Sequence, residues 1–164
     1  MKQLLLLVAL FGALPALSQH THTHVHGEGR LDVAIDTDTV TLDLELPLDA
    51  AVGFERAPRN DKERAALVAT ERALNDAAAL WQATSAANCT VQSVEVDMPQ
   101  FEGGEHADVD AHYVFRCSDP ALLKGIGTTI FKQFKRLYRL ETQRIGPAGQ
   151  GAQRLSPKTP ALSW

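Results

Sequence analysis

Four histidines near the start of the chain alternate with Thr, Thr and Val: His20, His22, His24 and His26. Neutral imidazole offers a nitrogen lone pair to Zn²⁺, Cu²⁺ or Ni²⁺. In an extended chain every second side chain lies on the same face, so the four rings can point one way, with Glu28 continuing the row. Neighbouring rings are then about 6.5–7 Å apart at the backbone, a gap that two rings can close around one ion. The run predicts a metal-binding leader; the alternative is a polar leader without a ligand.

A second alternating set of nitrogen and oxygen donors lies further along the chain: His106, Asp108, Asp110 and His112. Imidazole and carboxylate groups at i and i+2 of a strand share one face, where they could hold a divalent ion. The competing interpretation is the solvent face of a half-buried strand, which needs polar residues whatever its function. Both interpretations stay open on the sequence alone.

The first 18 residues read as a cleavable export signal. Lys2 supplies the positive start, residues 4–14 form an apolar run, and Ala16-Leu17-Ser18 offers a small-x-small cleavage site. The apolar run is too short to span a bilayer as a helix, and no cysteine follows it that could carry a lipid anchor. We therefore predict cleavage after Ser18 and a periplasmic mature protein without a membrane anchor.

The chain has two cysteines, Cys89 and Cys117. An even number of cysteines in an exported chain favours a disulfide. The alternative is a pair of zinc thiolates, but the sequence has no C-x-x-C pattern to support it. The formal charge of -4 and the lack of a basic stripe argue against a nucleic-acid partner.

Hydrophobic periodicity predicts three hairpins and one or two helices. Apolar and polar residues alternate over 29–36 and 40–46, as in a half-buried hairpin. An amphipathic helix is expected over 63–83, with a restart at Asn75-Asp76. Strands over 89–98 and 107–117 would place Cys89 opposite Cys117. A shift of apolar parity between Val91 and Val94 indicates a bulge in the first of these strands.

The C-terminal part predicts a short helical piece at 121–124, a third hairpin from strands at 137–145 and 150–155, and a segment at 128–134 that could be helix or strand. The predicted class is α+β, with an antiparallel sheet of about three hairpins packed on one or two helices. A length of 164 residues suits one domain. The expected boundaries are a signal at 1–18, a His-rich leader at 19–28, the domain at 29–156 and a tail at 157–164.

Five segments, in this order, resemble the ZrgA family of bacterial zinc-uptake proteins. They are the opening motif around His24 and His26, the signature Gly53-Phe54-Glu55 with Ala57-Pro58, the second histidine segment from His106 through Tyr113 to Cys117, the pair Phe131 and Phe134, and Gly149-Gln150-Gly151-Ala152. The resemblance implies a periplasmic protein that binds zinc and assists its uptake, together with an ABC-type importer. It implies no catalysis.

Two departures from the family pattern reduce the number of metal ligands. Many relatives have a long insertion rich in His, Asp and Glu before the second histidine segment, where this chain has only residues 99–105, with Glu102 and Glu105 as donors. Many relatives also have histidine at the position of Arg56. The resemblance therefore implies fewer sites or a lower zinc capacity in this chain.

Three hypotheses remain at this stage. The first is a zinc-binding accessory protein, whose affinity should fall as the histidines protonate near pH 6.5. The second is a zinc hydrolase, which is disfavoured because the chain lacks H-E-x-x-H and G-x-S-x-G. The third is a copper- or nickel-binding or metal-buffering protein, or a structural or interaction module without metal. Met98 is the only methionine beyond the signal, which weakens the case for Cu⁺ binding but leaves Cu²⁺ and Ni²⁺ open.

Overall fold

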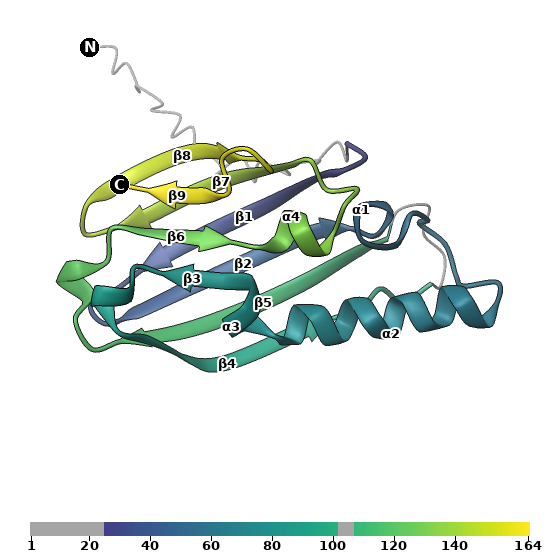
Figure 1. Ribbon diagram of the computed structural model, residues 1–164, viewed down its shortest axis with the longest axis horizontal. Coiled ribbons are helices and arrows are strands. Elements are labelled where there is room, and N and C mark those ends of the chain that lie inside the picture. The colour runs from purple at the N-terminus through teal and green to yellow at the C-terminus, as the bar shows by residue number, and fades with distance from the viewer. Residues whose placement is uncertain (1–24, 102–106) are drawn as a thin grey trace, which may run out of the picture.

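A six-stranded mixed sheet and a three-stranded antiparallel sheet form the fold in the computed structural model, which describes residues 25–101 and 107–164. The large sheet has the order β4-β5-β2-β1-β7-β8 and the small sheet the order β3-β6-β9 (Figure 1). The strands are β1 (Glu28–Ile35), β2 (Thr39–Pro47), β3 (Trp81–Ala83), β4 (Cys89–Asp97), β5 (Asp108–Cys117), β6 (Gly125–Thr128), β7 (Arg139–Gly146), β8 (Gly149–Leu155) and β9 (Ala161–Ser163). The helices are α1 (Leu48–Val52), α2 (Asp61–Asn75), α3 (Ala77–Leu80) and α4 (Ile130–Gln133), with 3-10 turns at Ser85–Ala87 and Pro120–Leu122.

The first predicted hairpin is confirmed by the antiparallel pairing of β1 and β2. Leu31 pairs with Leu44 and Val33 with Leu42, and all four side chains are buried. Residues between them along each strand face outward, because side chains alternate across a pleated strand. The apolar stripe in the sequence therefore becomes one wall of the core.

The second predicted hairpin, its bulge and the disulfide are also confirmed. β4 runs antiparallel to β5, and the register shifts between Val91 and Ser93. Cys89 pairs directly with Cys117 in the ladder, and their sulfur atoms are 2.02 Å apart. The disulfide links the edge strand β4 to its neighbour β5 in the sheet.

The expectation of a purely antiparallel sheet is wrong, because β1 also pairs in parallel with β7. Glu28 lies opposite Arg139 and Ala34 opposite Ile145. Parallel neighbours need a long crossover connection, here most of the chain. Local alternation of apolar residues predicts that a strand forms but carries no information about a partner so distant in sequence.

The helical prediction holds for α2 and for the restart, but its last residues differ. Asn60 caps α2 by accepting a hydrogen bond from the Glu63 amide at 2.9 Å, and Asp76 separates α2 from α3. Residues 81–83, predicted as helix, form β3 instead. The open segment 128–134 contains the short helix α4, and the segment expected to be a tail contains β9, which pairs with β6.

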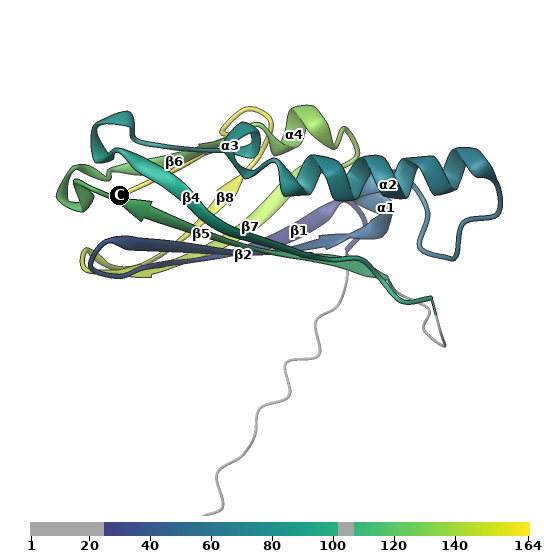
Figure 2. The same ribbon diagram turned by 90° about the horizontal axis from the view of Figure 1, so that it is seen from below.

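All the helices and the small sheet lie over one face of the six-stranded sheet, whose other face is open to solvent (Figure 2). The core between the layers includes Leu46, Leu74, Tyr113 and Ile130, each no more than 1% exposed. No helix in the described part of the chain is long and apolar enough to cross a membrane.

Candidate metal site

His26, Asp49 and Glu55 meet where α1 follows the end of β2, beside the start of β1 (Figure 1). The Nδ1 atom of His26 is 3.1 Å from Oδ2 of Asp49 and 3.6 Å from Oε1 of Glu55. One ligand atom from each residue lies within 4.8 Å of the other two. Among the described residues this is the one group of three His, Cys, Asp or Glu side chains close enough to share an ion.

A tight turn before β1 positions His26. The Glu28 amide donates to the Val25 carbonyl at 3.0 Å, and Gly27 has φ +73, in the left-handed region. A Cβ on Gly27 would be 2.6 Å from the ring of Tyr138. Only glycine fits this position, because it alone enters that region without steric cost and leaves room for the aromatic ring.

The carboxylates come from the short segment that follows β2. Asp49 lies in the first turn of α1, and Gly53 ends this helix with φ +88. The reversal at Gly53 brings Glu55 back toward Asp49. The guanidinium of Arg136 packs on Gly53, where a Cβ would be 2.8 Å from its Nε atom. A side chain at this position would displace either the turn or the arginine.

The spacing of the three donors suits zinc. With Zn–N and Zn–O bonds of about 2.0–2.2 Å, tetrahedral geometry separates neighbouring ligand atoms by about 3.4 Å, and the two distances from His26 lie on either side of that value. Three protein ligands leave a fourth position open. The His26 side chain is 75% exposed, whereas those of Asp49 and Glu55 are 21% and 16% exposed. The candidate site therefore has an exposed imidazole donor above a more enclosed pair of carboxylates.

The second oxygen of Asp49 supports a cationic ligand. Its Oδ1 atom is buried and has no hydrogen-bond partner among the described residues. A buried charge without compensation is unfavourable, and a bound cation is one way to stabilise it. Neutralisation by His26 as an imidazolium is the alternative, and it needs no metal.

Arg56 fixes the loop that carries Glu55 rather than joining the site. Its guanidinium donates to both carboxylate oxygens of Glu63, at 2.7 and 3.0 Å, and lies over the Phe54 ring at 5.0 Å. The hydrogen bonds from Arg56, followed by one from the Arg59 amide, lower the pKa of Glu63 to about 2. Arg56, where the family resemblance implies a histidine in many relatives, therefore acts here as a structural clamp.

Of the predicted leader ligands, only His26 lies within the described residues, where it forms the candidate cluster with Asp49 and Glu55. His20, His22 and His24 lie outside them. Asp49 and Glu55 were not identified as candidate ligands from the sequence. Glu55 stood in the family signature around Gly53 and Phe54, which is the signal that could have identified it. Asp49 stands out only as an acid just after the apolar run of β2.

The second predicted group follows the open face of the six-stranded sheet. Asp108, Asp110 and His112 share the outer face of β5, and His106 lies outside the described residues. The Nδ1 atom of His112 is 2.6 Å from Oδ1 of Asp43 on β2. These residues form no three-ligand cluster with other described side chains. On this part of the open face, His112 is therefore paired with Asp43 and surrounded by other acidic side chains.

Asp110 lies at the centre of that acidic surface. It pairs across the ladders with Glu45 on β2 and Asp97 on β4. Partial burial, followed by the charges of Glu45 and Asp97, raises the pKa of Asp110. The three carboxylates, with Arg30 and His112, line a hollow of about 420 Å³.

A protein-family model described as "ZrgA family zinc uptake protein" matches residues 23–164 of the chain. The match includes His26, Asp49 and Glu55, the outer face of β5 and both cysteines. A search of curated proteins finds no match.

Proposed function

The chain belongs to the ZrgA family of zinc uptake proteins, and from this we propose that it captures Zn²⁺ in the periplasm between His26, Asp49 and Glu55. The observation that carries the proposal is the position of His26 Nδ1, 3.1 Å from one carboxylate and 3.6 Å from the other. Zinc binds nitrogen and carboxylate oxygen ligands at such spacing. Because the family is one of zinc uptake, Zn²⁺ is the ion that this cluster is expected to bind.

The arrangement suits a site that releases its ion. A structural zinc site is closed by four protein ligands, whereas this one supplies three and leaves a position for water or a receiver's donor. The exposed imidazole of His26 can leave first. We propose that His20, His22 and His24 collect zinc ahead of this site, and that an ABC-type importer receives it.

The second histidine group has a secondary place in this proposal. His106, Asp108, Asp110 and His112 would hold a further, weaker ion on the open face. The pairing of His112 with Asp43 occupies one ring nitrogen, and Asp110 is surrounded by other acids. Fewer preassembled donors support a lower affinity here than at His26.

Two other functions use the same residues. Cu²⁺ or Ni²⁺ would also accept an imidazole with two carboxylates, and Cu²⁺ binds most such sites more tightly than Zn²⁺. Growth of a deletion strain under limitation of each metal separates these from zinc. An interaction module without metal would leave His26 as an ion-pair partner of Asp49 and Glu55. Catalysis has no support from the family, which is one of zinc uptake rather than an enzyme family.

The test is zinc titration calorimetry on the mature chain, residues 19–164. His20, His22 and His24 are first replaced by alanine, so that the leader contributes no imidazole. In this background we expect one tight site that weakens at least ten-fold in Glu55→Gln and in Asp49→Asn. Glu71→Gln, an exposed position on α2, is the matched control and should bind as its parent does. Equal affinity in all four proteins would overturn the proposal.

A further inference from the structure

A second hollow, of about 480 Å³, is lined by residues from the end of β1, from the segment that follows β5, from β7 and the turn after it, and by the C-terminal Trp164. Its apolar wall comes from Ile35, Ala121, Leu123 and Trp164, and two cations, Lys124 and Arg144, also line it. Nothing in the proposed zinc function uses this hollow.

Arg144 is the unusual feature of the hollow. It projects from β7 toward the core and is 8% exposed. Its guanidinium lies over the indole of Trp164 at 5.0 Å, and Nη1 donates to the Gly149 carbonyl at 3.0 Å. Within residues 25–101 and 107–164 it forms no ion pair with a carboxylate. Buried charges are usually paired, because an unpaired one loses its hydration without compensation.

The stacking on Trp164 explains only part of this arrangement. A guanidinium has five N–H donors, and the Gly149 carbonyl accepts from one nitrogen. Gly151 lets the group approach β8 closely, since a Cβ there would be 3.3 Å from Nη2. The fully enclosed polar atoms without a partner do not include any nitrogen of Arg144. Its remaining donors therefore keep some solvent contact, and the residue lines the hollow.

The rest of the lining indicates what would bind there. The Trp164 amide donates to the Lys124 carbonyl at 3.2 Å, which holds the two backbone segments side by side. Asp36 is the acid in the lining, and its Oδ1 already accepts from the Thr37 amide at 2.7 Å. Two cations and one acid thus line a hollow whose other walls are mostly aromatic and aliphatic.

We propose that this hollow binds a small organic carboxylate with a flat apolar body. The carboxylate would accept hydrogen bonds from the Arg144 guanidinium, in the planar geometry that arginine offers to such groups. Lys124 would add charge at the mouth, and the apolar body would lie against Ile35 and Leu123. Trp164 would form the edge of the site.

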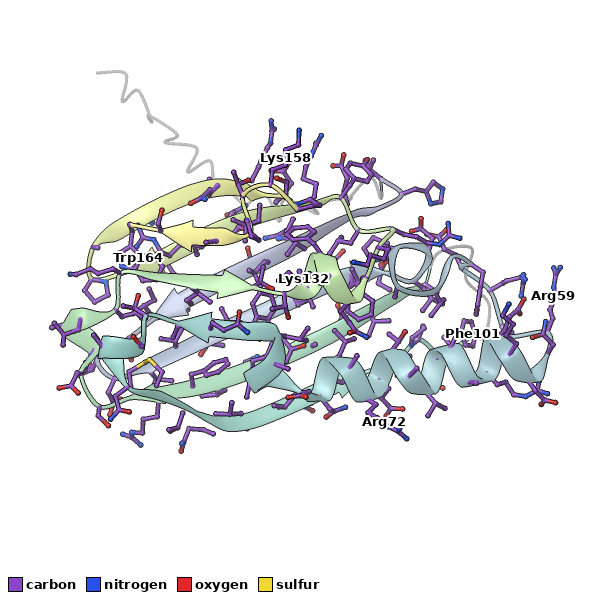
Figure 3. The ribbon with its side chains drawn as sticks, viewed as in Figure 1. Arg59, Arg72, Phe101, Lys132, Lys158 and Trp164 are labelled. Atoms are coloured by element: carbon purple, nitrogen blue, oxygen red, sulfur yellow. A yellow bond between two sulfur atoms is a disulfide. The ribbon has the colours of Figure 1, made fainter. Side chains whose placement is uncertain are left out.

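The test uses the fluorescence of Trp164 with benzoate as the probe. The other tryptophan, Trp81, is 3% exposed in the core, so ligand-dependent changes report on Trp164 (Figure 3). We expect saturable change with benzoate, and none with benzyl alcohol or inorganic phosphate at equal concentrations. Lys124→Gln should weaken benzoate about five-fold, and Arg144→Gln at least twenty-fold.

Two further variants keep the result decisive if Arg144→Gln fails to fold. Ala121 is exposed and lines the hollow, so the larger side chain of Ala121→Leu should partly fill it and weaken benzoate binding at least ten-fold. Lys158→Gln, which does not line the hollow, should bind as wild type does (Figure 3). Absence of saturable binding by the folded wild type, phosphate binding as strong as benzoate, or equal binding by Ala121→Leu would each overturn the proposal. Glu55→Gln should leave benzoate binding unchanged, so this result is independent of the zinc site.

Discussion

The Nδ1 atom of His26 lies 3.1 Å from Oδ2 of Asp49, although one residue precedes β1 and the other follows β2. The antiparallel pairing of β1 and β2 accounts for this meeting. Its open end is the pair Arg30 and Glu45, so the segments beyond them leave the sheet side by side. A hairpin specified by its apolar stripe thus brings a histidine and a carboxylate into position for one ion.

Gly27→Ala should disturb both the fold and zinc binding. The new Cβ meets Tyr138 at 2.6 Å in a left-handed backbone, so we expect a loss of stability of about 1–3 kcal/mol and zinc affinity at least ten-fold lower. Thermal unfolding and calorimetry measure the two effects. Gly149→Ala is the matched control, since its φ is +87 but nothing lies within 4 Å of its Cβ position. Gly149→Ala should lower the melting temperature without lowering zinc affinity. An equal loss of zinc affinity in both variants would contradict the role of the Gly27 turn.

Arg56→Met should release the carboxyl of Glu63. The pKa of this carboxyl is about 2 in the folded chain, and we expect it to rise toward the ordinary glutamate value of 4.5. The pKa of Glu63 is lower in the folded chain than in the unfolded chain. The ion pair with Arg56 therefore stabilises the protein above the unfolded pKa, and this stabilisation is lost as pH falls from about 4.5 to about 2. Carboxyl NMR titration measures the pKa directly. A Glu63 carboxyl that still titrates near 2 in the variant would show that Arg56 is not the cause.

Asp110→Asn should stabilise the protein at neutral pH. Burial and the charges of Glu45 and Asp97 raise the pKa of Asp110, so its ionised form destabilises the fold above the folded pKa. That penalty is absent below the unfolded pKa, about 3.9. We expect a melting temperature about 1–3 °C higher at pH 7, with the gain lost near pH 3. Asp119→Asn, at an exposed turn, should show no such pH-dependent gain, and an equal gain in both would remove the electrostatic explanation.

Replacing Cys89 and Cys117 by serine should destabilise the fold by about 2–4 kcal/mol, because the bridge restricts the unfolded chain between them. The disulfide is at the end of the molecule away from α1, so zinc affinity should change less than two-fold (Figure 3). Denaturant unfolding and calorimetry on the same protein measure both. Loss of zinc binding by a variant that still folds would contradict the separation of the two features.

The sequence predicted those parts of the fold that depend on neighbouring residues. Alternation gave the β1/β2 and β4/β5 hairpins, and the parity shift gave the bulge near Val91. The parallel pairing of β1 with β7 and the position of β9 depend on contacts between distant segments, which no local pattern encodes. Strand β3 was not predicted because residues 81–83 continue an alanine-rich helical pattern.

The candidate site was half predicted for the same reason. His26 was identified by its spacing from other histidines, but Asp49 and Glu55 have no spacing that relates them to it. Their meeting with His26 depends on the reversal at Gly53 and on the hairpin that joins α1 to the start of β1. Composition indicated metal binding, and only the tertiary structure indicated which carboxylates lie close enough to His26 to share an ion with it.

The most direct test of zinc capture at this site is an anomalous difference map, measured at the zinc absorption edge, from crystals of the zinc-loaded mature protein. We predict a peak about 2.0–2.2 Å from His26 Nδ1 and from one carboxylate oxygen each of Asp49 and Glu55. A strongest peak beside His112 and Asp43, with none at His26, would contradict the account.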